Sequence, residues 1–186
     1  MRKLFQSGLL AVAMSLAPLA HAGLIGDVGI TWLYPDTGTT FASDTIAVSS
    51  TLNCPGSSPI CTGYGTEGTE TFGVNSTSIT YTASVANSYA TSSFNGFDFT
   101  GLTFADAGTL TGFTLVNGLA GLTTSDVSFG PHSIEINLEG LAATGSFTLN
   151  LSEAAGASTP EPSFLAPLAL ALGGFAFFIR RRKATA

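Results

Sequence analysis

The stretch that decides the fold is HSIEINLEG, residues 132–140, in which apolar and polar side chains alternate. Successive side chains of an extended strand point to opposite faces, so the pattern predicts a β-strand with one buried face. The stretch GSFTLNLSE, residues 145–153, repeats it. We expect the two strands either to pair as an antiparallel hairpin or to lie in facing sheets. The side chains expected inside are Ile134, Ile136 and Leu138, then Phe147, Leu149 and Leu151.

Six further stretches alternate in the same way and are separated by Gly, Asn, Asp and Pro. In FNGFDFTGLTF, residues 94–104, Gly101 interrupts the alternation and predicts a bulge or a bend. About eight strands over residues 23–153 predict an all-β domain, an antiparallel β-sandwich or jelly roll. The other stretches are 28–34, 44–52, 77–86, 109–119 and 125–130. The expected core also takes in Trp32, Ile46, Val48, Phe72, Ile79, Phe97, Phe99, Phe104, Phe113, Leu115 and Phe129.

Charge is distributed unevenly along the 186 residues. All six basic residues lie at positions 2, 3 and 180–183, whereas eleven of the twelve acidic residues lie between Gly23 and Ser158. Nucleic-acid binding needs Lys and Arg to neutralise phosphates, so this composition excludes it. The same negative charge would repel an anionic membrane surface.

The first 22 residues have the three parts of a secretory signal peptide. MRK provides positive charge, residues 9–19 (LLAVAMSLAPL) form a short apolar segment, and Ala20-His21-Ala22 is a small-x-small cleavage site. The apolar segment is short for a membrane span. We therefore expect cleavage after Ala22 and export of the chain from Gly23 onward, with His132 as the single histidine of the mature domain.

The mature domain has two cysteines, Cys54 and Cys61, in CPGSSPIC. Export favours a disulfide between them, and the intervening Pro and Gly residues favour a turn that brings the thiols together. A redox or metal-binding pair is the alternative, but the spacing is not that of a C-x-x-C motif.

The C-terminal end reads as a linker at 154–163, an apolar helix at 164–179 and a basic tail at 180–186. The linker contains Pro160, Glu161 and Pro162. A helix of residues 164–179 would be about 24 Å long, which is marginal for a hydrocarbon core about 30 Å thick. Cations directly after a span favour the cytoplasmic side. This leaves a permanent membrane anchor or a transient one. The cations are Arg180, Arg181, Arg182 and Lys183.

This arrangement of Pro-Glu-Pro, a short apolar helix and a basic stop resembles a PEP-CTERM sorting signal. The resemblance covers roughly the last 27 residues. It implies that an exosortase-type membrane enzyme recognises Pro160, Glu161 and Pro162, that the protein resides transiently in the inner membrane, and that the tail is lost. It also implies an exopolysaccharide-producing bacterium. Residues 94–104 and 128–141 resemble, more loosely, β-rich domains found ahead of such signals; this carries over no catalytic residue.

Residues that bear chemistry are few. A triad of His132, Asp126 and a serine lacks a G-x-S-x-G elbow, and Gly-Pro-His reads instead as a turn. Glu135 and Glu139 would lie about 13 Å apart on one strand, too far for a glycosidase pair unless a neighbouring strand supplies a partner. We therefore expect no catalytic residue and no cofactor.

Binding residues can be considered beside simpler interpretations, which are a solvated acidic surface for the carboxylates and core packing for the aromatic rings. Acidic residues near strand ends would suit calcium, although no D-x-D-x-D-G loop is present. Exposed aromatic rings would suit stacking on sugars. GYGTEGTE, residues 63–70, reads as a flexible loop, and Asn75 begins an N-x-[ST] pattern. The acidic candidates are Asp98, Asp106 and Asp126, and the aromatic candidates are Trp32, Tyr34, Tyr64 and Tyr89.

The sequence thus predicts a non-enzymatic, exported β-domain protein of the cell envelope or extracellular matrix, associated with exopolysaccharide and sorted by its C-terminal signal. Its precursor would be anchored in the inner membrane. The alternative is a carbohydrate- or calcium-binding adhesion module. A secreted hydrolase is a third hypothesis, for which the sequence offers no assembled site.

Overall fold

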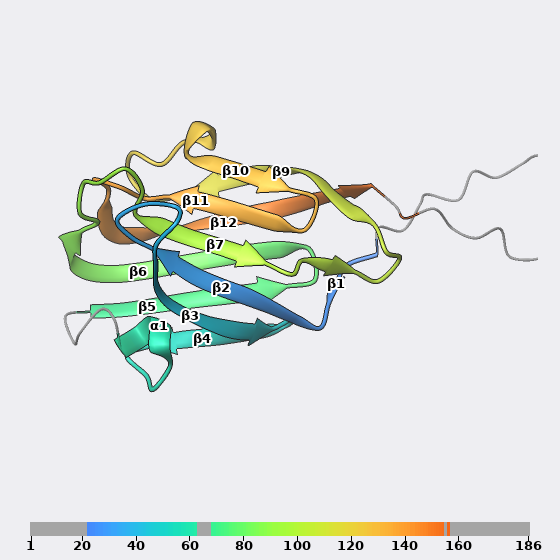
Figure 1. Ribbon diagram of the computed structural model, residues 1–186, viewed down its shortest axis with the longest axis horizontal. Coiled ribbons are helices and arrows are strands. Elements are labelled where there is room, and N and C mark those ends of the chain that lie inside the picture. The colour runs from blue at the N-terminus through green and yellow to red at the C-terminus, as the bar shows by residue number, and fades with distance from the viewer. Residues whose placement is uncertain (1–21, 63–67, 155, 157–186) are drawn as a thin grey trace, which may run out of the picture.

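The computed structural model describes residues 22–62, 68–154 and 156, and this part of the chain is mostly antiparallel β-structure. Two five-stranded sheets lie face to face (Figure 1). Aromatic rings join them across the interior, since Phe72 of the second sheet contacts Phe97 of the first with ring centroids 4.8 Å apart. The predicted antiparallel sandwich is therefore confirmed.

The first sheet has the strand order β10-β11-β7-β2-β3 and the second has the order β4-β5-β6-β12-β9. A two-stranded sheet of β1 and β8 accompanies them. The first sheet consists of β2 (Asp27–Leu33), β3 (Thr40–Ala47), β7 (Gly96–Thr100), β10 (Val127–Gly130) and β11 (Ser133–Asn137). The second consists of β4 (Ser50–Cys54), β5 (Gly68–Asn75), β6 (Ser78–Ser88), β9 (Thr109–Asn117) and β12 (Ala142–Ala154). The short elements are β1 (Leu24–Ile25), β8 (Thr103–Phe104), the helix α1 (Pro59–Thr62) and the 3-10 turn η1 (Thr124–Asp126).

The two regular stretches that decided the fold class become β11 and β12, and they lie in different sheets. Of the two arrangements expected for them, facing sheets is correct. The expected inward side chains are buried, apart from Leu151, which is partly buried. β11 ends at Asn137, so Glu139 lies beyond the strand rather than on it.

The predicted count of about eight strands is too low, because the described residues contain twelve. The expected strand 44–52 is divided into β3 and β4 by a turn in which Ser49 has a positive φ of 68°. β5 was missed because its Gly and Thr residues conceal the alternation, and residues 68–70, expected in a flexible loop, belong to it. β1 and β8 have two residues each, too few to leave a periodic pattern.

The core lies between the sheets, and most of the residues expected in it are buried there. Phe97 and Phe99 of β7 are fully buried, as are Phe72 and Ile79 of the second sheet. Phe129 was wrongly expected inside: its side chain is 45% exposed at the edge strand β10. Four other expected core residues are only partly buried: Trp32, Val48, Phe113 and Leu115.

Two glycines are required by the backbone around β7. Gly101 has a φ of +71°, which confirms the predicted bend between β7 and β8. A Cβ atom on Gly96 would lie 1.9 Å from the carbonyl oxygen of Ile136, so only glycine allows β7 to approach β11 at this end.

Cys54 and Cys61 form the predicted disulfide. Pro59–Thr62 forms the single helical turn α1, which contains Cys61, and Ile60 beside this cysteine is fully buried. Ser58 donates a hydrogen bond to Asp44, which fixes this segment to β3. The disulfide thus joins the α1 segment to the second sheet through β4, and the hydrogen bond of Ser58 joins it to the first sheet through β3.

The described helices lack the length and apolar composition for crossing a membrane. Most of the predicted terminal features lie outside the described residues, namely the signal peptide with Ala20, the segment 157–186 with the sorting motif, the apolar segment and the basic stop. Ala22, at the expected cleavage site, is the first residue described.

Candidate functional site

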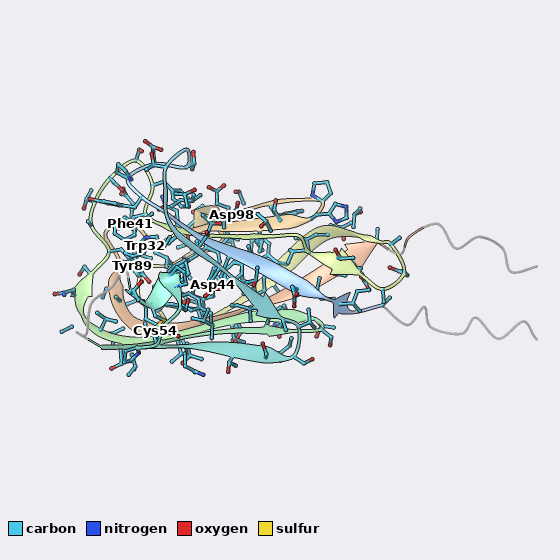
Figure 2. All side chains as sticks on the ribbon, turned by 60° about the horizontal axis from the view of Figure 1, so that its bottom comes forward. Trp32, Phe41, Asp44, Cys54, Tyr89 and Asp98 are labelled. Atoms are coloured by element: carbon cyan, nitrogen blue, oxygen red, sulfur yellow. A yellow bond between two sulfur atoms is a disulfide. The ribbon has the colours of Figure 1, made fainter. Side chains whose placement is uncertain are left out.

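One end of the sandwich carries a pocket of about 280 Å³. Strands of both sheets and the segment that joins β6 to β7 contribute to it. Figure 2 shows Phe41, Trp32 and Tyr89 gathered at this end, far from the two ends of the described chain. The lining residues are Trp32, Tyr34, Phe41, Val85, Asn87, Ser88, Tyr89, Ala90, Asn95 and Ala143.

Three aromatic rings form one side of the pocket. The ring of Trp32 is tilted by 51° against that of Phe41, with centroids 4.5 Å apart, and Tyr34 meets Phe41 edge to face at 6.4 Å. Phe41 is 51% exposed, while Trp32 and Tyr34 are partly buried. The three rings therefore present apolar surface to a ligand while they support one another.

A β-bulge places Phe41 at the pocket. Trp32 pairs with Ala42, and the next residue, Leu33, pairs with Thr40, so Phe41 has no partner in the ladder between β2 and β3. A bulge of this kind redirects a side chain out of the regular alternation. The bulge therefore explains why the large apolar ring of Phe41 is exposed at the pocket instead of packing in the core.

Asn95 fixes the position of Trp32. This residue is 2% exposed, and its Oδ1 accepts a hydrogen bond of 2.9 Å from the indole Nε1–H of Trp32. Its amide nitrogen donates to the carbonyl oxygen of Ala90 at 3.0 Å. The indole ring also packs on the buried ring of Phe97, with centroids 6.4 Å apart. Trp32 is therefore held in one orientation before any ligand arrives.

A buried acid lies behind the pocket. Glu70 of β5 is 2% exposed, and its Oε1 accepts hydrogen bonds from the hydroxyl groups of Tyr81 at 2.6 Å and Tyr89 at 3.1 Å. The two hydroxyl oxygens also lie within hydrogen-bond distance of each other, so the two tyrosine protons are shared among the three contacts. Burial raises the pKa of Glu70, and the two tyrosine donors only partly offset this effect. Burial, with the nearby Glu70, also raises the pKa of Tyr81.

The tyrosine pair connects this acid to the pocket, because the ring of Tyr89 lines the pocket while its hydroxyl binds Glu70. Of the two roles considered for Tyr89, sugar stacking and core packing, its 4% exposure and its place in the core support core packing. Trp32 and Tyr34 line the pocket, and Tyr64 lies outside the described residues. Phe41 was not predicted, since a bulge interrupts the alternation that would reveal it.

Two of the acidic residues considered as calcium ligands, Asp106 and Asp126, instead accept hydrogen bonds from the chain itself. Asp106 accepts hydrogen bonds from the backbone N–H groups of Gly108 and Gly156. Asp126 accepts from the backbone N–H and the hydroxyl of Thr123. Within the described ranges, no three His, Cys, Asp or Glu residues form a group suited to a metal ion. The calcium alternative thus receives no assembled site from this part of the chain.

The fold brings together two carboxylates whose proximity was not predicted from the sequence. Asp98 of β7 lies directly opposite Glu135 of β11 on the outer face of the first sheet. Burial, with the nearby Glu135, raises the pKa of Asp98. Glu139, considered together with Glu135, instead accepts a hydrogen bond from the backbone N–H of Ser92. Neither Asp98 nor Glu135 lines the pocket.

The side chain of His132 binds a backbone group. It lies in the turn between β10 and β11, as expected, and its Nδ1 is 2.9 Å from the carbonyl oxygen of Leu102. A carbonyl oxygen only accepts, so Nδ1 carries the proton and donates it. Asn75 is exposed at the start of the turn between β5 and β6.

The aromatic pocket is thus the place where exposed apolar rings, amide and hydroxyl groups, and a cavity coincide. Asn87 and Ser88, both exposed at the end of β6, provide polar groups on its lining. Comparison of the chain with family models, with curated proteins and with solved structures gave no significant match.

Proposed function

We propose that this chain is a non-enzymatic, exported protein of the cell envelope or extracellular matrix, delivered by its C-terminal sorting signal. The sequence feature that carries the proposal is the order of three elements: a predicted signal peptide at 1–22, an acidic β-domain, and Pro160-Glu161-Pro162 followed by an apolar segment and a basic stop. The disulfide between Cys54 and Cys61 supports export, since such bonds persist in oxidising compartments.

Cell fractionation tests the delivery. In a strain with exosortase, intact mass should place the mature N-terminus at Gly23 and the C-terminus near Thr159. In a strain without exosortase, or with Glu161→Ala in the motif, the longer precursor should stay in the inner membrane. A full-length, membrane-bound protein in both strains would refute the proposal.

For the exported domain, we further propose that the pocket binds carbohydrate. Sugar rings have apolar faces that stack on aromatic side chains and hydroxyl groups that bond to amides and hydroxyls. Trp32 and Phe41 offer the apolar surface, and Asn87 and Ser88 the polar groups. The volume of about 280 Å³ lies just below the range of about 300–1,000 Å³ for drug-sized ligands, which suits a single sugar ring.

The position of the pocket in the fold also suits an adhesion module. β12 begins beside the pocket, where Ala143 is a lining residue, and runs to Ala154 at the opposite end (Figure 1). A strand of this length spans roughly 40 Å. A domain attached by its C-terminus would therefore present the pocket away from the attachment point.

Isothermal titration calorimetry with a panel of oligosaccharides tests the binding. We expect at least one glycan to bind, and we expect Trp32→Ala to weaken it by at least about tenfold. A parallel titration with Ca²⁺ tests the calcium alternative, and analysis of the glycans for cleavage products tests a hydrolase. Cleavage that is lost with Glu135→Gln would contradict the non-enzymatic function.

A further inference from the structure

We infer that the pocket prefers a glycan that carries free amino groups, an inference that rests on the carbohydrate binding proposed above. Its basis is the coincidence of an aromatic pocket wall with a domain whose described residues carry negative charge and no Lys or Arg.

The first argument is the charge of the whole domain. No lysine or arginine occurs between Lys3 and Arg180, so the described part of the chain contributes acidic side chains without these cations to offset them. The summed field of such a surface attracts cations and repels anions on approach. A polymer of uronic acids or of sulfated sugars would meet this repulsion without an Arg or Lys to bind its anionic groups.

The second argument is the position of individual carboxylates. Asp36 lies two residues after Tyr34, in a turn closed by a hydrogen bond of 3.0 Å from the Tyr34 N–H to the Thr39 carbonyl oxygen. Glu139 binds Ser92, within the segment that bears Ala90 and Asn95. Two segments that supply lining residues therefore each hold an acidic side chain.

The third argument is the arrangement of the rings. Trp32, Tyr34 and Phe41 line one side of the cavity together, and their rings are inclined by 51° between Trp32 and Phe41 and by 76° between Tyr34 and Phe41. The face of an aromatic ring attracts a cation, so a pocket wall made of aromatic rings favours an ammonium group placed against it. A protonated sugar amine against these rings would also lie in the negative field of the domain.

A matched pair of ligands separates charge from shape. Oligomers of glucosamine and of N-acetylglucosamine of equal length share one backbone and differ in whether the nitrogen is an ammonium or a neutral amide. Calorimetry with the full chain, at mildly acidic pH and low salt, should give glucosamine oligomers about tenfold higher affinity, the order of one cation–π interaction. Salt should weaken the binding of glucosamine oligomers more than that of acetylated oligomers.

Three variants locate the effect. Phe41→Ala should reduce binding of both oligomers, because it removes ring surface from the pocket. Asp36→Asn should reduce the affinity for the glucosamine oligomer and leave that for the acetylated oligomer unchanged. Phe129→Ala is the matched control: this phenylalanine is 45% exposed, against 51% for Phe41, but does not line the pocket, so binding should stay unchanged.

The outcomes distinguish this inference from the function on which it rests. Equal affinity for the two oligomers, or tighter binding of a uronic-acid oligomer, would overturn the preference and leave carbohydrate binding intact. Absence of binding to any sugar would overturn both. Binding of glucosamine oligomers that Phe41→Ala does not reduce would show adsorption to the acidic surface, and would also overturn both.

Discussion

Two groups of partly exposed aromatic side chains on this molecule differ in what surrounds them. At the pocket, Phe41 packs on Trp32 and Tyr34. At the side where the edges of the two sheets meet, Phe129 of β10 packs edge to face on Phe113 of β9, with centroids 5.9 Å apart. The two exposed phenylalanines are almost equally accessible. Exposure therefore does not distinguish them.

The difference lies in the connections of each group. Trp32 is joined to the buried Asn95 and to the core ring of Phe97, and the pocket that it lines contains polar side chains. The ring pair of Phe113 and Phe129 spans the edge strands of two sheets and closes the sandwich at that side. We conclude that an exposed ring is a candidate for ligand binding when its orientation is fixed beside a cavity.

The largest expected effect concerns the ring below the pocket. Phe97 is fully buried and contacts Trp32, Phe72, Tyr81 and Tyr89. Phe97→Ala should lower the free energy of unfolding by about 3–5 kcal/mol, because it removes core contacts and leaves a cavity. Denaturant titration checks this. A loss below about 1 kcal/mol would contradict the role of Phe97 as the common support.

The disulfide is expected to matter less. Replacing both Cys54 and Cys61 by serine should cost about 2–3 kcal/mol, the loop-entropy value for so short a loop. Glu70 lies directly opposite Cys54 in the ladder between β4 and β5, and its partner Tyr89 lines the pocket. Hydrogen exchange should therefore increase around the pocket more than at β9 and β10. A uniform increase would argue against this local connection.

Asn95→Ala tests the orientation of Trp32. The substitution removes the acceptor of the indole N–H and the donor to Ala90, at a cost of about 1–3 kcal/mol. Ligand affinity should fall even though Asn95 acts through Trp32, and the near-ultraviolet circular dichroism of the single tryptophan should change. Asn75→Ala, at an exposed turn, is the control. An unchanged tryptophan signal with full affinity would contradict the positioning role.

The raised pKa of the buried Glu70 should make the folded state more stable as the pH falls. Its pKa is raised in the folded state above the ordinary value of 4.5, so the folded chain binds this proton more tightly than the unfolded chain. Stability should therefore rise as the pH falls from neutral towards this ordinary value. Glu70→Gln should flatten the slope of melting temperature against pH, and Asp98, whose pKa is also raised, should leave a residual slope of the same sign.

The exposed Asp27 provides the matched control, since Asp27→Asn also removes one carboxylate. An equal slope in the wild type and in Glu70→Gln would show that the buried acid does not determine this dependence.

Much of the fold can be predicted from the sequence because strands with one buried face leave a period of two. β7, β11 and β12 are recognisable in this way, and Gly101 marks the bend. The pocket is less predictable. Phe41 is on a bulge, which breaks the period, and Glu70 is on a strand whose small residues resemble a loop. The pairing of Asp98 with Glu135 depends on strand register, which no local pattern specifies.

The central claim is that fixed rings beside the pocket, rather than exposed rings in general, bind a sugar. The most direct test is calorimetric titration of the wild type, Phe41→Ala and Phe129→Ala with the same glucosamine oligomer. We predict that Phe41→Ala weakens binding about tenfold and that Phe129→Ala binds as tightly as the wild type. Equal affinity of all three proteins, or a larger loss with Phe129→Ala, would contradict the claim.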